Sequence, residues 1–329
     1  METDRRSQGQ VPDIHRMEIS VDWPPGQVAA TVIDGEEPIL VDAGMVGEKA
    51  ASELQRGLAE AGLTRSDIDH LVVTHPHVDH LGQIPALLEA ADPTVYAPAG
   101  VRERLGRDPN SLETTVRSNG KRAGLEGSTL DMAIEKSIKS LKRNRALLDP
   151  DVVDHWLDHD EGFEVGTHQF RAIHTPGHQA DHCCYHGQLN GVRVLFSGDL
   201  LLEPFRSIVL HTGLDDGVED GVRAFYTALD RLEVLDVDRV YPGHGPAHTQ
   251  LEETIDRSRN SLRRLLDHTR DLVADGAETA IEVALQRSTE RDIEYVVPEV
   301  VSAISHLEAH DELRVTVADG TNRYYADCE

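Results

Sequence analysis

The chain has 329 residues and a formal net charge of −27, with 39% hydrophobic residues and 5 lysines beside 27 arginines. This length supports one to three domains with a packed core, and no run approaches the ~18 apolar residues needed to cross a bilayer, which excludes a transmembrane span. The first residues, METDRRSQGQVPD, contain no apolar stretch typical of a signal sequence, so we expect a cytoplasmic protein. Dense carboxylates suit a halophilic, salt-rich cytoplasm, because a Debye length of ~3 Å at about 1 M salt limits their mutual repulsion.

The segment from about residue 17 to 43 has the pattern of β-hairpins. The run QVAATVI is followed by the turn residues DGEE and then by PILVDAG. GEKAASELQRGLAEAG has helical spacing, with Gly62 where a C-cap is expected. A strand in IDHLVVTHPHVDH then runs into a loop and into the helix IPALLEAA, whose Pro85 fits a first helical turn.

Five apolar strands of this chain each deliver a histidine or an aspartate at their carboxyl ends. The runs ILV, HLVV, FRAIH, VRVLF and VDRVY lead into DAG, THPHVDH, TPGH, SGD and PGHG. Ligands of open sheets gather beyond the strand ends. We therefore expect these five segments to form one shared rim.

The segment from about residue 101 to 160 has helical periodicity and no strand pattern, so we interpret it as a helical insertion. In DMAIEKSIKSLKRNRALL the residues Ile134, Ile138 and Leu141 recur at helix spacing, with basic side chains on the other faces. Residues 121–145 carry seven basic and three acidic side chains, a local charge of +4 within a chain of −27.

From about residue 250 the pattern changes to three helices and a hairpin. LEETIDRSRNSLRRLLDHTRDLVADG, ETAIEVALQ and PEVVSAISHLEAHDEL have helical patterns, and the strands LRVTV and RYY flank the turn ADGTN. This is the outline of a winged helix. We therefore expect a main domain over 1–249, containing the insertion at about 101–160, and a winged-helix-like domain over 250–329.

The stretch THPHVDH places three histidines and an aspartate within six residues. Histidine and carboxylate ligands without cysteine favour zinc, iron, manganese or nickel over a structural thiolate zinc site. Side chains alternate in an extended segment, so His75 and His77 project to one side and can bind one ion together. Asp79 and His80 follow as the chain turns into the next helix. Four such ligands divide better between two ions roughly 3.5 to 4 Å apart than they fit around one.

In their order along the chain, VDAG, THPHVDH, TPGH, SGD and YPGHG resemble the signature motifs of the metallo-β-lactamase fold superfamily. The most similar branch is that of the glyoxalase II-like hydrolases with a C-terminal winged helix, and the resemblance covers about residues 17 to 329. It implies an α+β fold, a four-layer αββα sandwich of two β-sheets with helices outside and metals at one edge. The helical insertion and the small winged-helix domain are expected as additions to this sandwich.

The resemblance also implies a role for each motif residue. The first metal is assigned to His75, His77 and His178, the second to Asp79, His80 and His244, and the bridging position to Asp199. Asp42 resembles a residue that orders the ligand loop, and His182 resembles a pocket neighbour that is not a ligand. We therefore expect two divalent metal ions per chain, zinc first, with iron or manganese as alternatives.

Two features bear on how far the family pattern applies. The family often has TPGHTxGH where this chain has TPGHQADH, so Asp181 replaces a glycine near the third ligand and either adds a charge to the pocket or caps a turn. The antibiotic-cleaving branch lacks the bridging aspartate. The presence of Asp199 therefore argues against lactam turnover.

These features predict a dinuclear metal-dependent hydrolase, in which a metal-bridged hydroxide attacks a small acyl thioester or ester, as in glyoxalase II-like enzymes. Asp79 is the catalytic residue that we expect to orient this hydroxide and carry a proton. One alternative is a phosphodiesterase or endoribonuclease of the same fold. Another is a mononuclear iron dioxygenase, against which the presence of His80 and His244 beside the first three ligands argues.

The expected substrate is a small molecule, and the basic insertion has two interpretations. It is either a lid that attracts an anionic substrate, with Lys136, Lys139 and Lys142 as candidate binding residues, or the solvated face of a packing helix. Residues 250–329 contain nine basic and eighteen acidic side chains, so we do not expect this module to bind DNA. We expect it to form a homodimer or to close the pocket, and we expect no membrane partner.

Overall fold

The computed structural model describes residues 13–288 and 293–326. Its first sheet has six strands in the order β1-β2-β3-β4-β5-β6. These strands are β1 Ile14–Ser20, β2 Gln27–Ile33, β3 Ile39–Val41, β4 His70–Val72, β5 Thr94–Pro98 and β6 His155–Leu157. The pairs from β1 to β3 are antiparallel and those from β3 to β6 are parallel. The carboxyl ends of the parallel strands therefore meet at one edge of the sheet.

The second sheet has five strands in the order β11-β10-β9-β8-β7. These strands are β7 Gly162–Val165, β8 His168–His174, β9 Cys183–Leu189, β10 Val192–Gly198 and β11 Arg239–Pro242. Neighbours are antiparallel from β7 to β10, while β11 runs parallel to β10. Because of this parallel pairing, β10 and β11 also end at the same edge.

An apolar layer joins the two sheets. Along β7 the side chains of Phe163 and Val165 are buried while Glu164 is exposed, which is the period of two that a strand with one buried face requires. Each large side chain buried in this way contributes roughly 1.5–3 kcal/mol to stability. The layer between the sheets includes Ile39, Val41, Val72, Phe163, Phe170, Tyr185 and Phe196.

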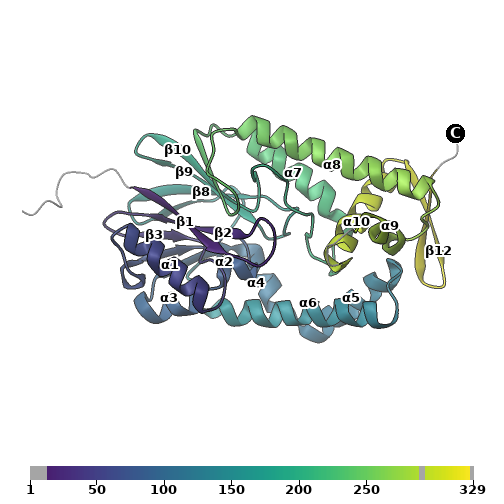
Figure 1. Ribbon diagram of the computed structural model, residues 1–329, viewed down its shortest axis with the longest axis horizontal. Helices are drawn as coiled ribbons and strands as arrows, with labels where there is room; N and C mark the ends of the chain where they lie inside the picture. Colours follow the sequence, from purple (N-terminus) through teal and green to yellow (C-terminus); the bar gives the residue numbers. More distant parts are fainter. Residues whose placement is uncertain (1–12, 289–292, 327–329) are drawn as a thin grey trace, which may run out of the picture.

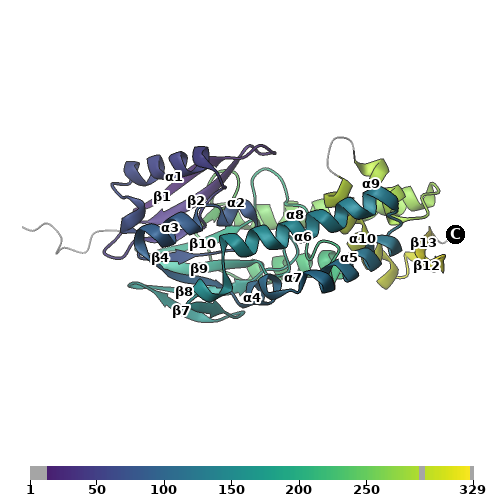
Figure 2. The same cartoon turned by 90° about the horizontal axis from the view of Figure 1, so that it is seen from below.

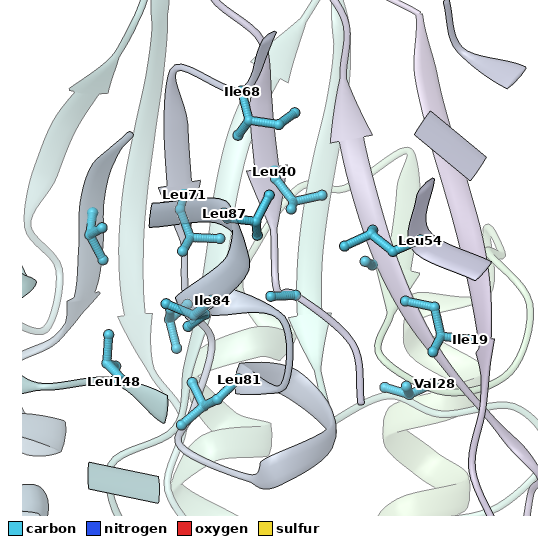
Figure 3. Packing of buried hydrophobic residues seen from close by; sticks show 14 of the residues in the cluster. Ile19, Val28, Leu40, Leu54, Ile68, Leu71, Leu81, Ile84, Leu87 and Leu148 are labelled. Carbon is cyan, nitrogen blue, oxygen red and sulfur yellow. The ribbon is translucent and has the colours of Figure 1, made fainter. Parts of the chain in front are cut away.

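Helices α1 (Glu48–Glu60) and α3 (Ile84–Ala91) cover the outer face of the first sheet (Figure 1). Leu54 and Leu58 lie four residues apart on one side of α1, and both are fully buried. Leu54, Leu87 of α3 and Leu40 of β3 belong to one apolar cluster (Figure 3). Hydrophobic burial therefore fixes both helices against this sheet.

Helices α7 (Gly221–Glu233) and α8 (Leu251–Ala274) belong to the opposite side of the molecule (Figure 1). Leu229 of α7 and Leu262 of α8 share an apolar cluster with Leu195 of β10, and all three are fully buried. The layers thus run helix, sheet, sheet, helix. The expected four-layer αββα sandwich is confirmed.

The insertion contains α4 (Ala99–Gly106), α5 (Pro109–Arg122) and α6 (Gly127–Leu147). In Figure 2, α6 runs from the sheets toward the C-terminal elements, with α5 beside it. The expectation that no strand occurs between residues 101 and 160 is wrong, because β6 pairs with β5 at the edge of the first sheet. The strand β6 has only three residues, which are too few to show an alternating pattern in the sequence. No helix within 13–288 and 293–326 is both long and apolar enough to cross a membrane.

The C-terminal elements pack against the insertion. After α8 come α9 (Ala280–Arg287), α10 (Ile293–Ala309) and the antiparallel hairpin of β12 (Leu313–Ala318) and β13 (Thr321–Ala326). Their buried side chains and those of α5 and α6 form a single apolar cluster. The insertion and the C-terminal elements thus stabilise each other. The winged-helix identity of this module and the boundary at residue 250 stay predictions.

Candidate metal centre

The stretch from Thr74 to His80 lies just beyond the end of β4. His77 is the extended residue that precedes α2 (Val78–Leu81), and Asp79 and His80 lie in that single turn of helix. His75, Asp79 and His80 are buried, with exposed fractions of 0%, 5% and 0%. The chain thus changes from extended to helical between His77 and Asp79, and the rings of His75 and His80 still lie 4.2 Å apart between centroids.

One group of ligand-capable side chains contains His75, His77, His178 and Asp199, and one atom from each lies within 4.8 Å of the others. The Nδ1 atom of His77 is 3.0 Å from Nε2 of His75 and 3.1 Å from Nε2 of His178. His178 comes from the loop that follows β8. Three imidazoles with their nitrogens converging on one point are suited to bind a divalent transition metal.

A second group contains Asp79, His80 and His244, again with the ligand atoms within 4.8 Å of one another. The Nε2 atom of His244 lies 3.4 Å from the Oδ2 atom of Asp79. His244 follows β11, the last strand of the second sheet. The close approach requires glycine at residue 243, because a Cβ there would lie 2.7 Å from Cε1 of His80 and 2.8 Å from Oδ1 of Asp199.

Asp199 lies between the two groups. Its Oδ2 atom is 3.2 Å from Nε2 of His178 on one side. Its Oδ1 atom is 3.1 Å from Nε2 of His80 and 3.4 Å from Nε2 of His244 on the other. A carboxylate that directs one oxygen at each group has the geometry needed to bridge two ions.

Asp42 connects the strand end of β3 to the ligand loop. Its Oδ1 accepts a hydrogen bond from the backbone N–H of Thr74 (2.8 Å), and its Oδ2 accepts from the hydroxyl of Thr74 (2.7 Å). The Nδ1 atom of His80 is 2.7 Å from the same Oδ2. This contact holds the proton on Nδ1 and leaves Nε2 of His80 facing Asp199.

Backbone carbonyls orient two further imidazoles. Nδ1 of His178 donates to the carbonyl of Ile208 at 3.0 Å, and Nδ1 of His244 donates to the carbonyl of Gln27 at 2.6 Å. Each ring therefore presents Nε2 to the centre. This pattern, in which the outer nitrogen is held by an oxygen, is common for histidines that bind metals.

His182 positions Asp199 and is not part of either ligand group. Its Nε2 accepts a hydrogen bond from the backbone N–H of Asp199 at 3.1 Å, and its Nδ1 lies 2.8 Å from the hydroxyl of Thr175. Burial, together with nearby His178, lowers the pKa of His182 to about 3. The ring is therefore neutral and can accept the Asp199 hydrogen bond.

The electrostatics differ between the two groups. Burial, reinforced by neighbouring imidazoles, lowers the pKa of both His75 and His77 well below the ordinary value. Burial also acts to lower the pKa values of His80 and His244, but nearby carboxylates outweigh it, and they raise the pKa of His244 to about 10. Burial opposes ionisation of Asp199, yet His244 and His80 hold its pKa well below the ordinary range.

The arrangement fits two divalent cations. Nε2 of His80 and Oδ1 of Asp199 are buried and face each other at 3.1 Å, and neither makes a hydrogen bond to any residue within 13–288 and 293–326. Buried polar atoms need partners, and a cation between these two would satisfy both. All seven predicted ligands are brought together, with Asp42 and His182 behind them; their role as ligands stays a prediction.

Asp181, the aspartate found in place of a glycine, lies behind the centre. Its side chain is 4% exposed, and neither carboxylate oxygen has a hydrogen-bond partner among the residues described. Burial raises the pKa of Asp181, although Arg104 opposes this with its Nε 3.9 Å from Oδ2. The carboxylate of Asp181 thus faces Arg104, which also lines a cavity beside the first ligand group.

A cavity of about 360 Å³ adjoins the metal centre and reaches the C-terminal elements. His77 and Gln179 line it beside the first ligand group, and Tyr295 and Pro298 of α10 line it elsewhere. Its cationic lining residues are Arg104, Arg107, Lys136, Lys139 and Arg143. Of the three lysines considered from the sequence, Lys136 and Lys139 line this cavity and the exposed Lys142 is not among its lining residues.

Arg104, Arg107, Gln179 and Tyr295 were not foreseen as cavity residues. Gln179 directly follows the predicted ligand His178 in the motif TPGHQ, and its amide contacts His77. This position next to a ligand could have indicated from the sequence that Gln179 lies at the site. Arg104 and Arg107 lie at the end of α4, and Tyr295 lies in α10. No local pattern marks these three, since they become neighbours only when the insertion packs against the C-terminal module.

Two ligand groups at the strand ends of an αββα sandwich define the class of metallo-β-lactamase-type folds. A metallo-beta-lactamase family protein from Thermus thermophilus, TTHA1429, has this fold, with a TM-score of 0.78 at 22% identity over 95% of this chain and 98% of that chain. A beta-lactamase domain protein from Burkholderia ambifaria has a TM-score of 0.77 at 20% identity, covering 96% of this chain and 93% of that one.

The model of the metallo-beta-lactamase superfamily matches residues 23–244, and the chain belongs to this superfamily. A probable metallo-hydrolase from Bacillus subtilis, YqjP, is 25% identical over 92% of this chain and 94% of its own length. A beta-lactamase-like protein 2 homolog from Caenorhabditis elegans is 28% identical over 71% of this chain and 63% of its own. The thioesterase pkgB from Emericella nidulans is 26% identical over 68% of this chain and 47% of its own.

Proposed function

We propose that the protein is a dinuclear metal-dependent hydrolase that cleaves small acyl thioesters or esters. The main support for this proposal is the orientation of Asp199, whose carboxylate directs one oxygen at each of two adjacent ligand groups. Two ions held by these groups would lower the pKa of a water molecule and polarise the substrate oxygen. Similarity to a metallo-hydrolase and to a thioesterase supports the same reaction class.

The protein's own contribution to the reaction is orientation and proton transfer. Asp79 is 5% exposed and belongs to the second ligand group, with its Oδ2 3.4 Å from Nε2 of His244. We assign it to accept a proton from the attacking water and to return a proton to the leaving thiolate. The water oxygen joins the acyl carbon, the C–S bond breaks, and the products are a carboxylic acid and a thiol.

Asp79 is suited to this role by its position. In the metal-free chain burial acts to raise the pKa of Asp79, but the hydrogen bond from His244 and the charge of His80 lower it below the ordinary value. Fixed in a turn of helix, this carboxylate can accept a proton from one position. A phosphodiester or RNA substrate is less well supported, because Tyr295 is the single aromatic lining residue of the described cavity apart from His77.

The test is a substrate screen of the metal-loaded full chain in high salt. Acyl thioesters, lactones, phosphodiesters and RNA are compared, with Asp199→Ala as the inactive blank and Asp256→Ala, at an exposed position of α8, as the matched control. We expect thioesters to be hydrolysed fastest, with activity kept in the control and lost in the blank. Faster cleavage of phosphodiesters or RNA would overturn the thioesterase proposal.

A further inference from the structure

Three cationic side chains follow one another along the cavity side of α6. Lys136, Lys139 and Arg143 are spaced by three and four residues, which places them on one face of the helix, and all three line the cavity. At a rise of 1.5 Å per residue the row extends over roughly 10 Å. In a chain with a net charge of −27, such a row marks a local site for anions.

The row begins at the metal centre and leads away from it. Asn144, next to Arg143, is buried and donates a 2.5 Å hydrogen bond to the carbonyl of Pro76, between His75 and His77. This contact fixes the C-terminal part of α6 beside the ligand loop. Lys139 and Lys136 lie successively farther from that point. An anion bound to these lysines would therefore lie at a distance from the bond that is cleaved at the metal ligand groups. The substrate would need a linking chain to span that distance.

Two of these cations are not neutralised by carboxylates. Within residues 13–288 and 293–326, no ion pair of Lys139 or Arg143 with a carboxylate is found, and Arg143 donates hydrogen bonds to the side chains of Asn144 and Ser140. Arg107 on the facing wall differs, because Asp215 pairs with it at 2.8 Å.

The rest of the cavity wall combines apolar side chains with polar ones and with the carboxylate of Asp215, which pairs with Arg107. Its uncharged lining residues include Leu105, Leu112, Val116, Ala133, Leu141, Leu210 and Leu214. An apolar wall facing a row of cations suits a flexible, partly apolar arm that carries several negative charges. A substrate with a single carboxylate would occupy only one or two of the cations. Phosphate groups carry more charge and accept the forked hydrogen bonds of arginine.

We propose that this cavity binds the leaving-group side of the substrate, a thiol that carries phosphate groups at the end of a flexible arm. Coenzyme A is the soluble acyl carrier with this chemistry. Lys139 and Arg143 bind the phosphates, Arg104 lies on the facing wall, and the thioester lies beside His77 and Asp79. This inference deepens the proposed thioesterase function and rests on it for the position of the acyl group.

The kinetic test compares three butyryl thioesters with the metal-loaded full chain at one salt concentration. Butyryl-coenzyme A has phosphates, butyryl-pantetheine has the arm without them, and S-butyryl-glutathione has carboxylates instead. We expect kcat/KM for the coenzyme A ester to exceed both others by about tenfold or more, mainly through KM. Equal values for the coenzyme A and pantetheine esters, or a preference for the glutathione ester, would overturn the inference while leaving a thioesterase.

The binding test separates the site from the reaction. Calorimetric titration of coenzyme A into the metal-free full chain is compared for the wild type, Lys139→Gln and Arg143→Gln. The control is Lys49→Gln, at an exposed position of α1 away from the cavity. We expect each cavity variant to bind coenzyme A about tenfold more weakly and the control to match the wild type. Binding without thioesterase activity would refute the proposed function alone, and unchanged binding in both cavity variants would refute the site.

Discussion

The side-chain amide of Asn144 donates a 2.5 Å hydrogen bond to the backbone carbonyl of Pro76. Asn144 lies in α6 of the insertion, and Pro76 separates the first two predicted ligands. Asn144 is buried, with 4% of its surface exposed, and its Oδ1 accepts a hydrogen bond from Nε of Arg143. The insertion is thus coupled directly to the ligand loop and also supplies a wall of the cavity.

Replacing Asn144 should weaken the metal centre without touching a ligand. Asn144→Ala leaves the carbonyl of Pro76 without a partner, which costs about 1–3 kcal/mol of unfolding free energy. A less ordered ligand loop should also bind the first metal more weakly. Chemical denaturation and metal titration measure the two effects. Asn110→Ala, at an exposed position of α5, is the control. Equal stability and metal affinity in Asn144→Ala and the control would show that this contact does not support the loop.

Glu299 of α10 should be a second residue that supports the centre from a distance. Its carboxylate is 2.8 Å from Arg206, 3.1 Å from Arg287, and accepts from the backbone N–H of Val209 at 3.1 Å. Val209 follows Ile208, whose carbonyl orients His178. Glu299→Gln should lower the unfolding free energy by about 3 kcal/mol, because it removes the buried counter-charge of two partly buried arginines. Glu308→Gln, exposed on the same helix, should have little effect in the same denaturation experiment.

The same carboxylate predicts a dependence of stability on pH. Burial opposes ionisation of Glu299, but Arg206 and Arg287 hold its pKa below the ordinary value of 4.5. A lowered pKa stabilises the fold above pH 4.5, and this contribution is lost as the pH falls through the folded-state pKa. Between pH 6 and 3 the wild type should therefore lose more unfolding free energy than Glu299→Gln. Parallel pH profiles for the two proteins would refute this role.

Metal binding should release protons from the second ligand group. Carboxylates raise the pKa of His80 well above its ordinary value and that of His244 to about 10, so both rings are protonated near neutral pH when no ion is bound. The charge of His244 stabilises the metal-free chain fully below the ordinary value of 6.5, and this contribution is lost as the pH rises through about 10. An ion must displace these protons, so we expect about two per chain to be released. Calorimetry in buffers of different ionisation enthalpy measures them, and no release would contradict the assigned ligands.

The net charge of −27 predicts that salt stabilises the protein. At 0.1 M salt the Debye length is ~10 Å, and at 1 M it is ~3 Å, so added salt reduces repulsion between surface carboxylates. We expect the Tm in 2 M KCl to be higher than in 0.1 M KCl by several degrees. Thermal unfolding followed by circular dichroism at a series of KCl concentrations measures this. A constant or falling Tm would argue against adaptation to a salt-rich cytoplasm.

The strand pattern of the sequence was sufficient to predict one shared rim for the ligand motifs, for a physical reason, whereas the sandwich and the assignment of seven ligands came from the resemblance to the metallo-β-lactamase superfamily. Each of the five motifs follows a short apolar strand, and parallel strands end at one edge of their sheet. The position of His178 or His244 therefore depends on local pattern and on one general rule of topology. Asp42 could be placed in the same way, because it follows β3.

The cavity could not be predicted in this way. Arg104, Lys139 and Tyr295 come from three helices that meet because the insertion and the C-terminal elements share one apolar core. Nothing in the periodicity of α6 distinguishes Lys139, which faces the cavity, from Lys142, which does not line it. The strand β6 was missed because its three residues gain their stability from pairing with β5 and not from a local pattern.

The most direct test of the proposed dinuclear hydrolase is thioester hydrolysis measured as metal is added to the metal-free chain. Two adjacent ligand groups with Asp199 between them predict that the rate rises until two equivalents of zinc, manganese or iron are bound, and that Asp199→Asn stays inactive throughout. A rate that reaches its maximum at one equivalent of iron and requires oxygen would contradict the account.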